Sequence, residues 1–152
     1  MIPAFRLCKT RYVPTAFQGD GARLYGGRWN SPGQPVIYTA ASLSLATLEV
    51  MVHLEDRTAL AYLFSWIPIR IPERTIETID VADLPSGWLS DEIGAASRNI
   101  GDRWLHEQRS ATLAVPSVVT PGEWNYLLNP AHSDFAKIEI GQPTAFRPDP
   151  RL

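Results

Sequence analysis

Residues 19–33, GDGARLYGGRWNSPG, constrain the fold of this chain most, because they contain five glycines and one proline. Residues with such free or such fixed backbones disfavour both a regular helix and a central strand. The segment is therefore predicted to be a structured loop. It leads into residues 35–40, PVIYTA, which predict a short strand with Val36, Tyr38 and Ala40 on one face.

The segment that follows, SLSLATLEVMVHLE, predicts a helix over residues 43–55. No glycine or proline interrupts it, and Ser42 is a favourable N-cap. Apolar side chains surround nearly the whole helical circumference, so the helix is expected to be largely buried. Glu49 interrupts the apolar pattern and falls on a mostly apolar stripe. A buried carboxylate usually has a partner, so Glu49 either pairs with a cation such as Arg11 or His53 or serves chemistry.

The rest of the chain predicts mainly short strands, because 13 prolines and 10 glycines divide it into short elements. The expected elements are a strand or strand pair over 60–71 with an edge or bulge at Pro68, a strand over 74–81, a helix from 97 or 102 to 108 with Trp104 and Leu105 facing inward, a strand over 112–119 that breaks near Pro116, and a strand over 136–140. These elements, in a chain of 152 residues of which 45% are apolar, predict a single α+β domain. The composition excludes a disordered, collagen-like or coiled-coil chain.

The charge balance argues against dedicated nucleic-acid binding. Fourteen Lys and Arg against sixteen Asp and Glu give a net charge of −2, so no global basic field exists. The cations are nearly all arginine, which suits bidentate phosphate contacts made by a few side chains. Arg6 and Arg11 are secondary candidates for such contacts, with surface exposure as the alternative.

Other features bear on the cellular compartment. Cys8 is the only cysteine, so no disulfide can form within the chain, and a buried inert thiol is expected. No apolar run reaches 18 residues and no signal peptide is evident, which favours a cytoplasmic protein.

His53, His106 and His132 are widely separated and show no metal-ligand spacing, so no metal site is expected.

Arg28, Tyr38 and Glu49 lie on the predicted loop, strand and helix in succession. A cation on a glycine-rich loop can meet an anionic ligand closely. An aromatic ring on the next strand offers a planar face for stacking. A carboxylate on an apolar helix can face a developing positive charge with little water to screen it. Together they predict a site for a substrate with phosphates at one end and a cationic centre at the other.

Residues 21–54 resemble the signature of the RES-domain toxins, in which a GGRWN-type loop precedes an xVIYTA-type strand and an LAxLE-type helix. The spacings of 10 positions from Arg28 to Tyr38 and 11 from Tyr38 to Glu49 are similar to the family arrangement. Ser117, in LAVPSVV, is most similar to the family's serine. EWNYLLNP at 123–130 and DPRL at 149–152 extend the resemblance, so residues 1–152 are identified as one RES domain.

The resemblance implies a fold like that of ADP-ribosyltransferases, with central split β-sheets and flanking helices. It implies the toxin of a type II toxin–antitoxin pair, which depletes NAD⁺ by hydrolysis or phosphorolysis of the nicotinamide–ribose bond. The alternatives are a toxin that transfers ADP-ribose to a protein and a noncatalytic binding module in a regulatory complex. The implied partners are a helix-turn-helix, Xre-like antitoxin and a second copy of the chain in a homodimer. NAD⁺ is substrate, and no prosthetic group is expected.

The resemblance also implies roles for individual residues. Arg28 would bind the diphosphate or the nicotinamide side, and Tyr38 would stack on or orient the nicotinamide half. Glu49 would stabilise the ribosyl cation, and Ser117 would hydrogen-bond the ligand at its ribose or amide. The remaining expected NAD⁺ contacts are Trp29 and Asn125.

Overall fold

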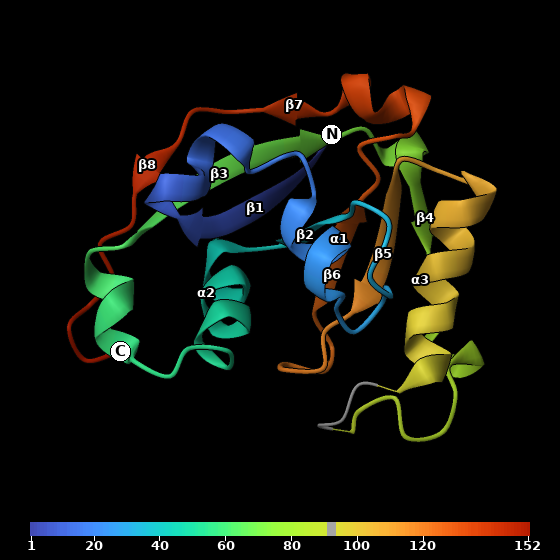
Figure 1. Ribbon diagram of the computed structural model, residues 1–152, viewed down its shortest axis with the longest axis horizontal. Coiled ribbons are helices and arrows are strands. Elements are labelled where there is room, and N and C mark those ends of the chain that lie inside the picture. Colours follow the sequence, from blue (N-terminus) through green and yellow to red (C-terminus); the bar gives the residue numbers. More distant parts are fainter. Residues whose placement is uncertain (91–93) are drawn as a thin grey trace.

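The computed structural model describes residues 1–90 and 94–152, and within them the chain forms one α+β domain (Figure 1). The strands are β1 (Ile2–Lys9), β2 (Ile37–Ala40), β3 (Phe64–Ile71), β4 (Ile76–Thr78), β5 (Thr112–Pro116), β6 (Trp124–Leu128), β7 (Glu139–Ile140) and β8 (Thr144–Ala145). The α-helices are α1 (Asp20–Tyr25), α2 (Leu43–Met51) and α3 (Ala95–Glu107). Short 3₁₀ helices are η1 (Thr10–Thr15), η2 (Arg57–Ala61), η3 (Glu73–Thr75), η4 (Val81–Asp83) and η5 (Ser133–Lys137).

All these strands belong to one sheet of order β4-β5-β6-β2-β1-β3-β7, in which β8 also pairs with β3. The sheet is nearly divided in the middle. β1 pairs with β3 along its whole length, and β2 pairs with β6 along its whole length, but β1 and β2 meet only at Phe5 and Ala40. The expected split sheet is therefore present, as two halves joined at one residue pair.

Each half of the sheet packs against a different helix (Figure 1). One core cluster joins α2 to β1 and β3 and contains Leu7, Ala40, Leu45, Ala46, Leu60, Phe64 and Phe146. Another joins α3 and the loop after α1 to β5 and β6 and contains Trp29, Val36, Trp104, Leu105, Leu113, Val115 and Leu127. Trp104 and Leu105 face inward as predicted. The gap between the halves is thus bordered by α2 on one side and the loop after α1 on the other.

The helix predicted over 43–55 is α2, which ends earlier, at Met51. The Ser42 side chain accepts a hydrogen bond from the backbone N–H of Leu45 at 3.0 Å, so the predicted N-cap is confirmed. The expectation of burial around the whole helix is wrong, because α2 packs on the sheet with one side only. Leu48 and Val52, on the other side, are 38% and 59% exposed.

The prediction of a loop throughout residues 19–33 is wrong for α1, which is a short helix. Gly19 and Gly26 flank it, each with φ of 72°, a conformation that glycine adopts at little cost. These glycines delimit the helix instead of interrupting it. Gly21, inside the helix, has open space around it. The remaining residues to Gly33 form the predicted loop.

Several predicted strands are shorter than expected. The one predicted from residue 60 begins at Phe64, because Asp56 caps η2 by accepting from the N–H of Thr58. The strand predicted over 74–81 is reduced to β4 between η3 and η4, and the one over 136–140 is reduced to β7 after η5. β5 ends at Pro116, which confirms the predicted break. Pro68 lies in β3 between the positions paired with β8 and with β7, so the predicted edge feature is present.

β1 and β6 lie where the sequence pattern predicted no strand. β1 carries Arg6 and Lys9 among its apolar residues, and its partner β3 is distant in the chain. Strand pairing of this kind is decided by tertiary contacts more than by local propensity. The helix predicted from residue 97 or 102 begins at Ala95 and passes through Gly101. Within the described residues, no helix is long and apolar enough to cross a bilayer.

Candidate active site

A cavity of about 590 Å³ lies where the two halves of the sheet separate. This volume falls in the range of about 300–1,000 Å³ that is usual for small-molecule and cofactor sites. Mostly apolar side chains line it, together with a few polar ones from β1, the loop after α1, β2, α2 and β6. The polar lining residues include Arg6, Arg28, Tyr38, Glu49 and Asn125.

The Glu49 carboxylate is held in place by two donors outside α2, one just after β5 and one on β6. Its Oε1 accepts from Ser117 Oγ at 2.7 Å and from Asn125 Nδ2 at 2.7 Å. Ser117 is fully buried, and its Oγ in turn accepts from the backbone N–H of Thr120 at 3.0 Å. Within the described residues, neither Arg11 nor His53 pairs with Glu49, and no hydrogen bond reaches Oε2. One carboxylate oxygen is therefore fixed, and the other is available to a ligand.

Asn125 adds a second polar atom to the cavity wall. Its Nδ2 is used by Glu49, whereas its buried Oδ1 has no hydrogen-bond partner within the described residues. A buried unpaired acceptor costs free energy unless a ligand or water satisfies it. Asn125 lines the cavity as a residue, while this oxygen is enclosed by protein atoms.

Arg28 reaches the cavity from the loop after α1. Its Nη1 donates to the backbone oxygen of Trp88 at 3.3 Å, and no acidic side chain pairs with it among the described residues. Since only this one bond is formed within the described part of the chain, the half-buried guanidinium has donors left for an anion. The preceding residue, Gly27, has no space for a side chain, because a Cβ there would lie 2.6 Å from the Tyr38 hydroxyl oxygen.

Arg6 is a second cation in the cavity. It is half-buried on β1, where Nε donates to Ala16 O at 2.8 Å and Nη1 to Tyr38 O at 3.0 Å, a bond that crosses between the two halves of the sheet. Burial lowers its pKa, and the neighbouring Cys8 opposes that effect. Arg11, by contrast, is exposed and lies over the Tyr12 ring at 4.8 Å. Of the two secondary candidates, only Arg6 lines the cavity.

Cys8 is buried, as the sequence predicted. Its burial raises the pKa of the thiol, and the nearby Arg6 acts in the opposite direction. A thiol whose pKa is raised carries little of the reactive thiolate at neutral pH. Cys8 is therefore a core side chain with no chemistry assigned to it.

Tyr38 lines the cavity, and its hydroxyl is hydrogen-bonded within the protein. The hydroxyl donates to Asn30 Oδ1 at 2.6 Å and accepts from the backbone N–H of Trp29 at 3.2 Å. Burial raises the pKa of Tyr38 well above its usual value, and the charge of Asp102 adds to this rise. The Trp29 N–H and the Arg28 charge act in the opposite direction. The Tyr38 hydroxyl is thus engaged by Asn30 and Trp29 within the protein.

A raised pKa predicts a loss of stability at alkaline pH. The folded state keeps the Tyr38 proton where the unfolded chain, with a tyrosine pKa of about 10, releases it. The free energy of unfolding should therefore fall as pH rises above about 10, with this residue contributing at most about 1.4 kcal/mol per pH unit. Urea unfolding of wild type and Tyr38→Phe at pH 8 to 11 measures it. A Tyr38→Phe profile as steep as that of wild type would contradict the prediction.

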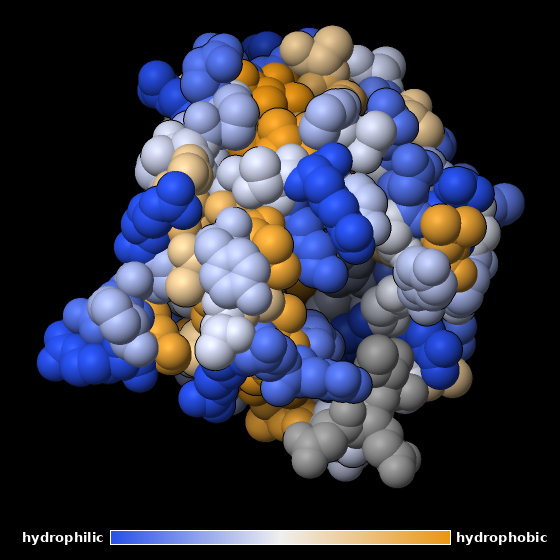
Figure 2. Space-filling model, turned by 60° about the vertical axis from the view of Figure 1, so that its left-hand side comes forward, coloured by the Kyte–Doolittle hydropathy of each residue, from blue (hydrophilic) through white to orange (hydrophobic). Residues whose placement is uncertain are grey.

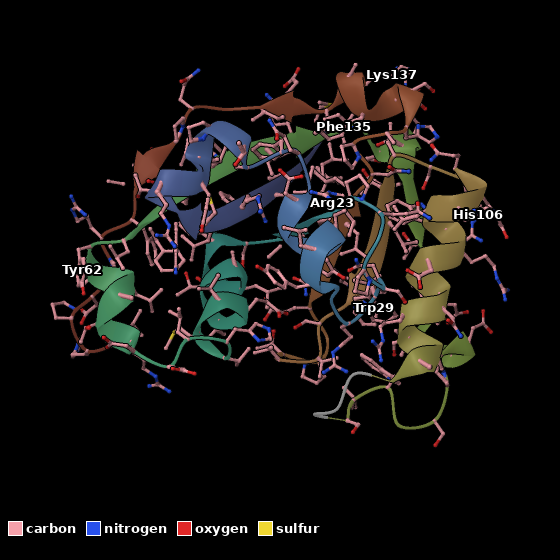
Figure 3. All side chains as sticks on the ribbon, viewed as in Figure 1. Arg23, Trp29, Tyr62, His106, Phe135 and Lys137 are labelled. Atoms are coloured by element: carbon pink, nitrogen blue, oxygen red, sulfur yellow. The ribbon has the colours of Figure 1, made fainter. Side chains whose placement is uncertain are left out.

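Trp29 lines the cavity and is almost fully buried between its loop and α3 (Figure 3). His106, for which no site role was expected, lies on the outer side of α3 (Figure 3). Within residues 1–90 and 94–152, no group of three or more histidine, cysteine and acidic side chains could hold a metal ion.

The structure adds site residues that the sequence did not single out. Asn30 is fully buried, and its Nδ2 donates to the backbone oxygens of Ala22 and Ser31. Asp102 on α3 accepts from Ser31. The GGRWN-type motif contains Asn30, but a polar residue in a loop is usually solvated, so the pattern assigned it no role. Asp102 is distant in the sequence and carried no signal.

Comparison with known proteins is consistent across sequence and structure. Residues 3–149 match the family described as "RES domain". The chain is 43% identical to a "Toxin Res" of Photorhabdus laumondii, over 88% of this chain and 85% of the relative. It is 41% identical to a "Toxin Res" of Yersinia enterocolitica, over 97% of each. A "Prs ADP-ribosylating toxin" of a Sphingobium species is 38% identical, over 93% of this chain and 89% of the relative.

A solved structure shows the same fold. The crystal structure of the M. tuberculosis MbcT-MbcA toxin-antitoxin complex contains a chain that superposes with a TM-score of 0.78 at 18% sequence identity. The superposition covers 95% of the present chain and 84% of that one. At this identity the likeness concerns the fold alone.

Proposed function

The chain belongs to the RES domain family, and from this premise we propose that it is a toxin that consumes NAD⁺ by cleaving the bond between nicotinamide and ribose. The relatives named Toxin Res support the role of toxin. The relative named as an ADP-ribosylating toxin supports NAD⁺ as substrate. The proposal places the protein in the cytoplasm, where NAD⁺ is available.

The single observation that carries this function is the arrangement of charges around one cavity. Glu49 offers a fixed carboxylate, while Arg28 and Arg6 offer cations that no acid within the described residues neutralises. NAD⁺ has a matching distribution, with a cationic nicotinamide riboside at one end and a diphosphate in the middle. Arginine suits diphosphate oxygens because its planar donors can bind them in pairs. The Tyr38 ring supplies a flat face for the nicotinamide half.

The proposed reaction needs one carboxylate and no strong acid. The bond between the ribose carbon and the pyridinium nitrogen breaks, and its electron pair leaves with nicotinamide, which becomes neutral. Positive charge develops on the ribose as in glycoside cleavage. Glu49 Oε2 stabilises this charge, and an acceptor oxygen from water or phosphate then bonds to the carbon and releases its proton to solvent. The products are nicotinamide and ADP-ribose or its 1″-phosphate.

Ser117 acts in this proposal as a positioning residue. It is fully buried and donates to Glu49, so its hydroxyl reaches the substrate only through the carboxylate. This role differs from the direct ligand contact that the family resemblance implied. Trp29 and Asn125 remain proposed ligand contacts, since both line the cavity.

Ser117→Ala should lower kcat about tenfold and leave KM for NAD⁺ nearly unchanged. The loss of one charge-assisted hydrogen bond of about 1.5–3 kcal/mol loosens the carboxylate at the moment the ribose charge develops. Steady-state kinetics with NAD⁺ measures both constants. A rise in KM with unchanged kcat would instead indicate that Ser117 contacts the ligand.

A second candidate function is transfer of ADP-ribose to a protein. The relative named "Prs ADP-ribosylating toxin" favours it, and the same cavity would cleave the same bond. A noncatalytic binding module is the remaining alternative. It would retain the cavity as a docking surface without turnover.

One experiment separates these possibilities. Purified protein is incubated with NAD⁺, with and without phosphate and with a cell extract, and the products are resolved by chromatography and by label transfer. Free ADP-ribose indicates hydrolysis, its 1″-phosphate indicates phosphorolysis, and a labelled protein band indicates transfer. No reaction under any condition would refute the enzymatic proposal.

Protein partners are also expected for this toxin. The complex of MbcT with MbcA supports an antitoxin partner here. We propose that this antitoxin is an Xre-like helix-turn-helix protein encoded nearby and that the toxin forms a homodimer within the larger complex. Copurification of the toxin with the product of the neighbouring gene, followed by mass measurement, tests both.

A further inference from the structure

We infer that Asp102, on α3, is a positioning residue that sets the location of Arg28 by holding the loop that carries Arg28. The inference rests on the proposed function for its kinetic consequence. It concerns the loop formed by residues 26–31, called here the Arg28 loop. Figure 3 shows the labelled Trp29 of this loop against α3.

The contact between Asp102 and the Arg28 loop uses both carboxylate oxygens. Oδ1 accepts from the backbone N–H of Ser31 at 2.7 Å, and Oδ2 accepts from Ser31 Oγ at 2.6 Å. Hydrogen bonds to an ionised carboxylate are short and about twice as strong as those between neutral groups. Two such bonds from one side chain to one residue fix orientation as well as distance.

A second contact from the same turn of α3 seats the loop backbone. Gly101 lies directly against Trp29, and a Cβ at this position would overlap the main-chain oxygen of Trp29. α3 therefore touches the residue next to Arg28 through its backbone and the residue three positions after Arg28 through Asp102. The helix itself is anchored in the core, since Trp104 is fully buried.

Contacts inside the loop transmit this restraint to Arg28. The N–H of Gly27 donates to Asn30 O at 2.9 Å, and the Tyr38 hydroxyl binds both Asn30 and the N–H of Trp29. The loop is thus closed on itself around Arg28. Asp102 holds the C-terminal residue of this loop, Ser31, through two hydrogen bonds. A shift of Ser31 would therefore move the whole loop. A displacement of about 1 Å in a substrate-positioning group can cost about 100-fold in rate.

The kinetic test compares variants that keep or remove the contact. Asp102→Ala should lower kcat/KM for NAD⁺ about 10- to 100-fold. Asp102→Asn should stay within about threefold of wild type, because its carboxamide can accept from the Ser31 N–H and donate to Ser31 Oγ. Ser31→Ala, which keeps the backbone bond, should fall between the two. A loss in Asp102→Asn as large as in Asp102→Ala would overturn the inference.

A double variant separates positioning from a general structural role. If Asp102 acts through Arg28, then Arg28→Ala with Asp102→Ala should be no slower than Arg28→Ala alone, within about twofold. An Asp102→Ala effect that persists in full without Arg28 would overturn the inference.

Hydrogen exchange gives a readout that does not depend on NAD⁺. In Asp102→Ala, the amides of Gly27 and Trp29 should exchange about tenfold faster or more, although neither bonds to Asp102. Amides of β5 serve as the internal reference, because that strand is buried throughout. A change at Ser31 alone would overturn the inference. If wild type does not turn over NAD⁺, the proposed function fails, while faster exchange at Gly27 and Trp29 still supports the positioning contact.

Discussion

Glu49→Gln is expected to lower NAD⁺ turnover by about 10²- to 10³-fold, the loss typical of a group that stabilises transition-state charge. The substitution keeps the size and shape of the side chain, and its amide oxygen can still accept from Ser117 and Asn125. What it removes is the negative charge that, in the proposed reaction, faces the ribose as nicotinamide leaves. The effect should fall on kcat, because the charge on the sugar exists only near the transition state.

The experiment measures kcat and KM with NAD⁺ alongside thermal unfolding. Glu55→Gln is a matched control, because it removes the same charge from an exposed residue just beyond α2. The control should keep wild-type turnover. Wild-type turnover in Glu49→Gln, with a normal melting temperature, would remove Glu49 from the mechanism.

Gly101→Ala is expected to destabilise the fold by about 3 kcal/mol, near the upper range for overpacking. Alanine in a helix interior ordinarily gains up to about 1 kcal/mol over glycine. Here the added Cβ would overlap the backbone oxygen of Trp29, which cannot rotate away as a flexible side chain would. Either α3 or the Arg28 loop must move, so the core around Trp104 loosens as well.

Thermal or urea unfolding measures the change, with an expected drop in Tm of about 6–12 °C for a chain of this size. Gly21→Ala is the matched control, since this helical glycine in α1 has nothing within 4 Å of a Cβ. The control should leave Tm unchanged or raise it. Equal behaviour of the two variants would show that α3 does not rest on Trp29.

The elements that local signals define were predictable from the sequence. Ser42 and an uninterrupted apolar run predicted the start of α2, and Pro116 predicted the end of β5. The elements that only distant partners define were not. β1 carries charged residues on a weak apolar pattern, and it is a strand because β3 covers its full length. α1 was missed because glycines that flank a helix look, in a sequence, like glycines that prevent one.

The candidate site divides in the same way. Arg28, Tyr38 and Glu49 follow one another on neighbouring elements with regular spacing, so a resemblance could single them out. The residues that hold these side chains in place, or line the cavity with them, lie in distant parts of the sequence. Asp102 lies 71 positions after its partner Ser31, and Arg6 enters from a strand that the pattern did not reveal. The Tyr38 hydroxyl had no sequence signal that it would bind Asn30 and Trp29 in preference to a ligand.

One face of the molecule is chemically mixed, with polar side chains interspersed with apolar patches (Figure 2). The cavity lies where β1 and β2 share a single residue pair. Here the backbone oxygen of Tyr38 on β2 accepts a hydrogen bond from Arg6 Nη1 on β1. This link between the two halves of the sheet uses a main-chain acceptor, which every residue carries. A substitution of the Tyr38 side chain that preserves the fold should therefore leave the link intact.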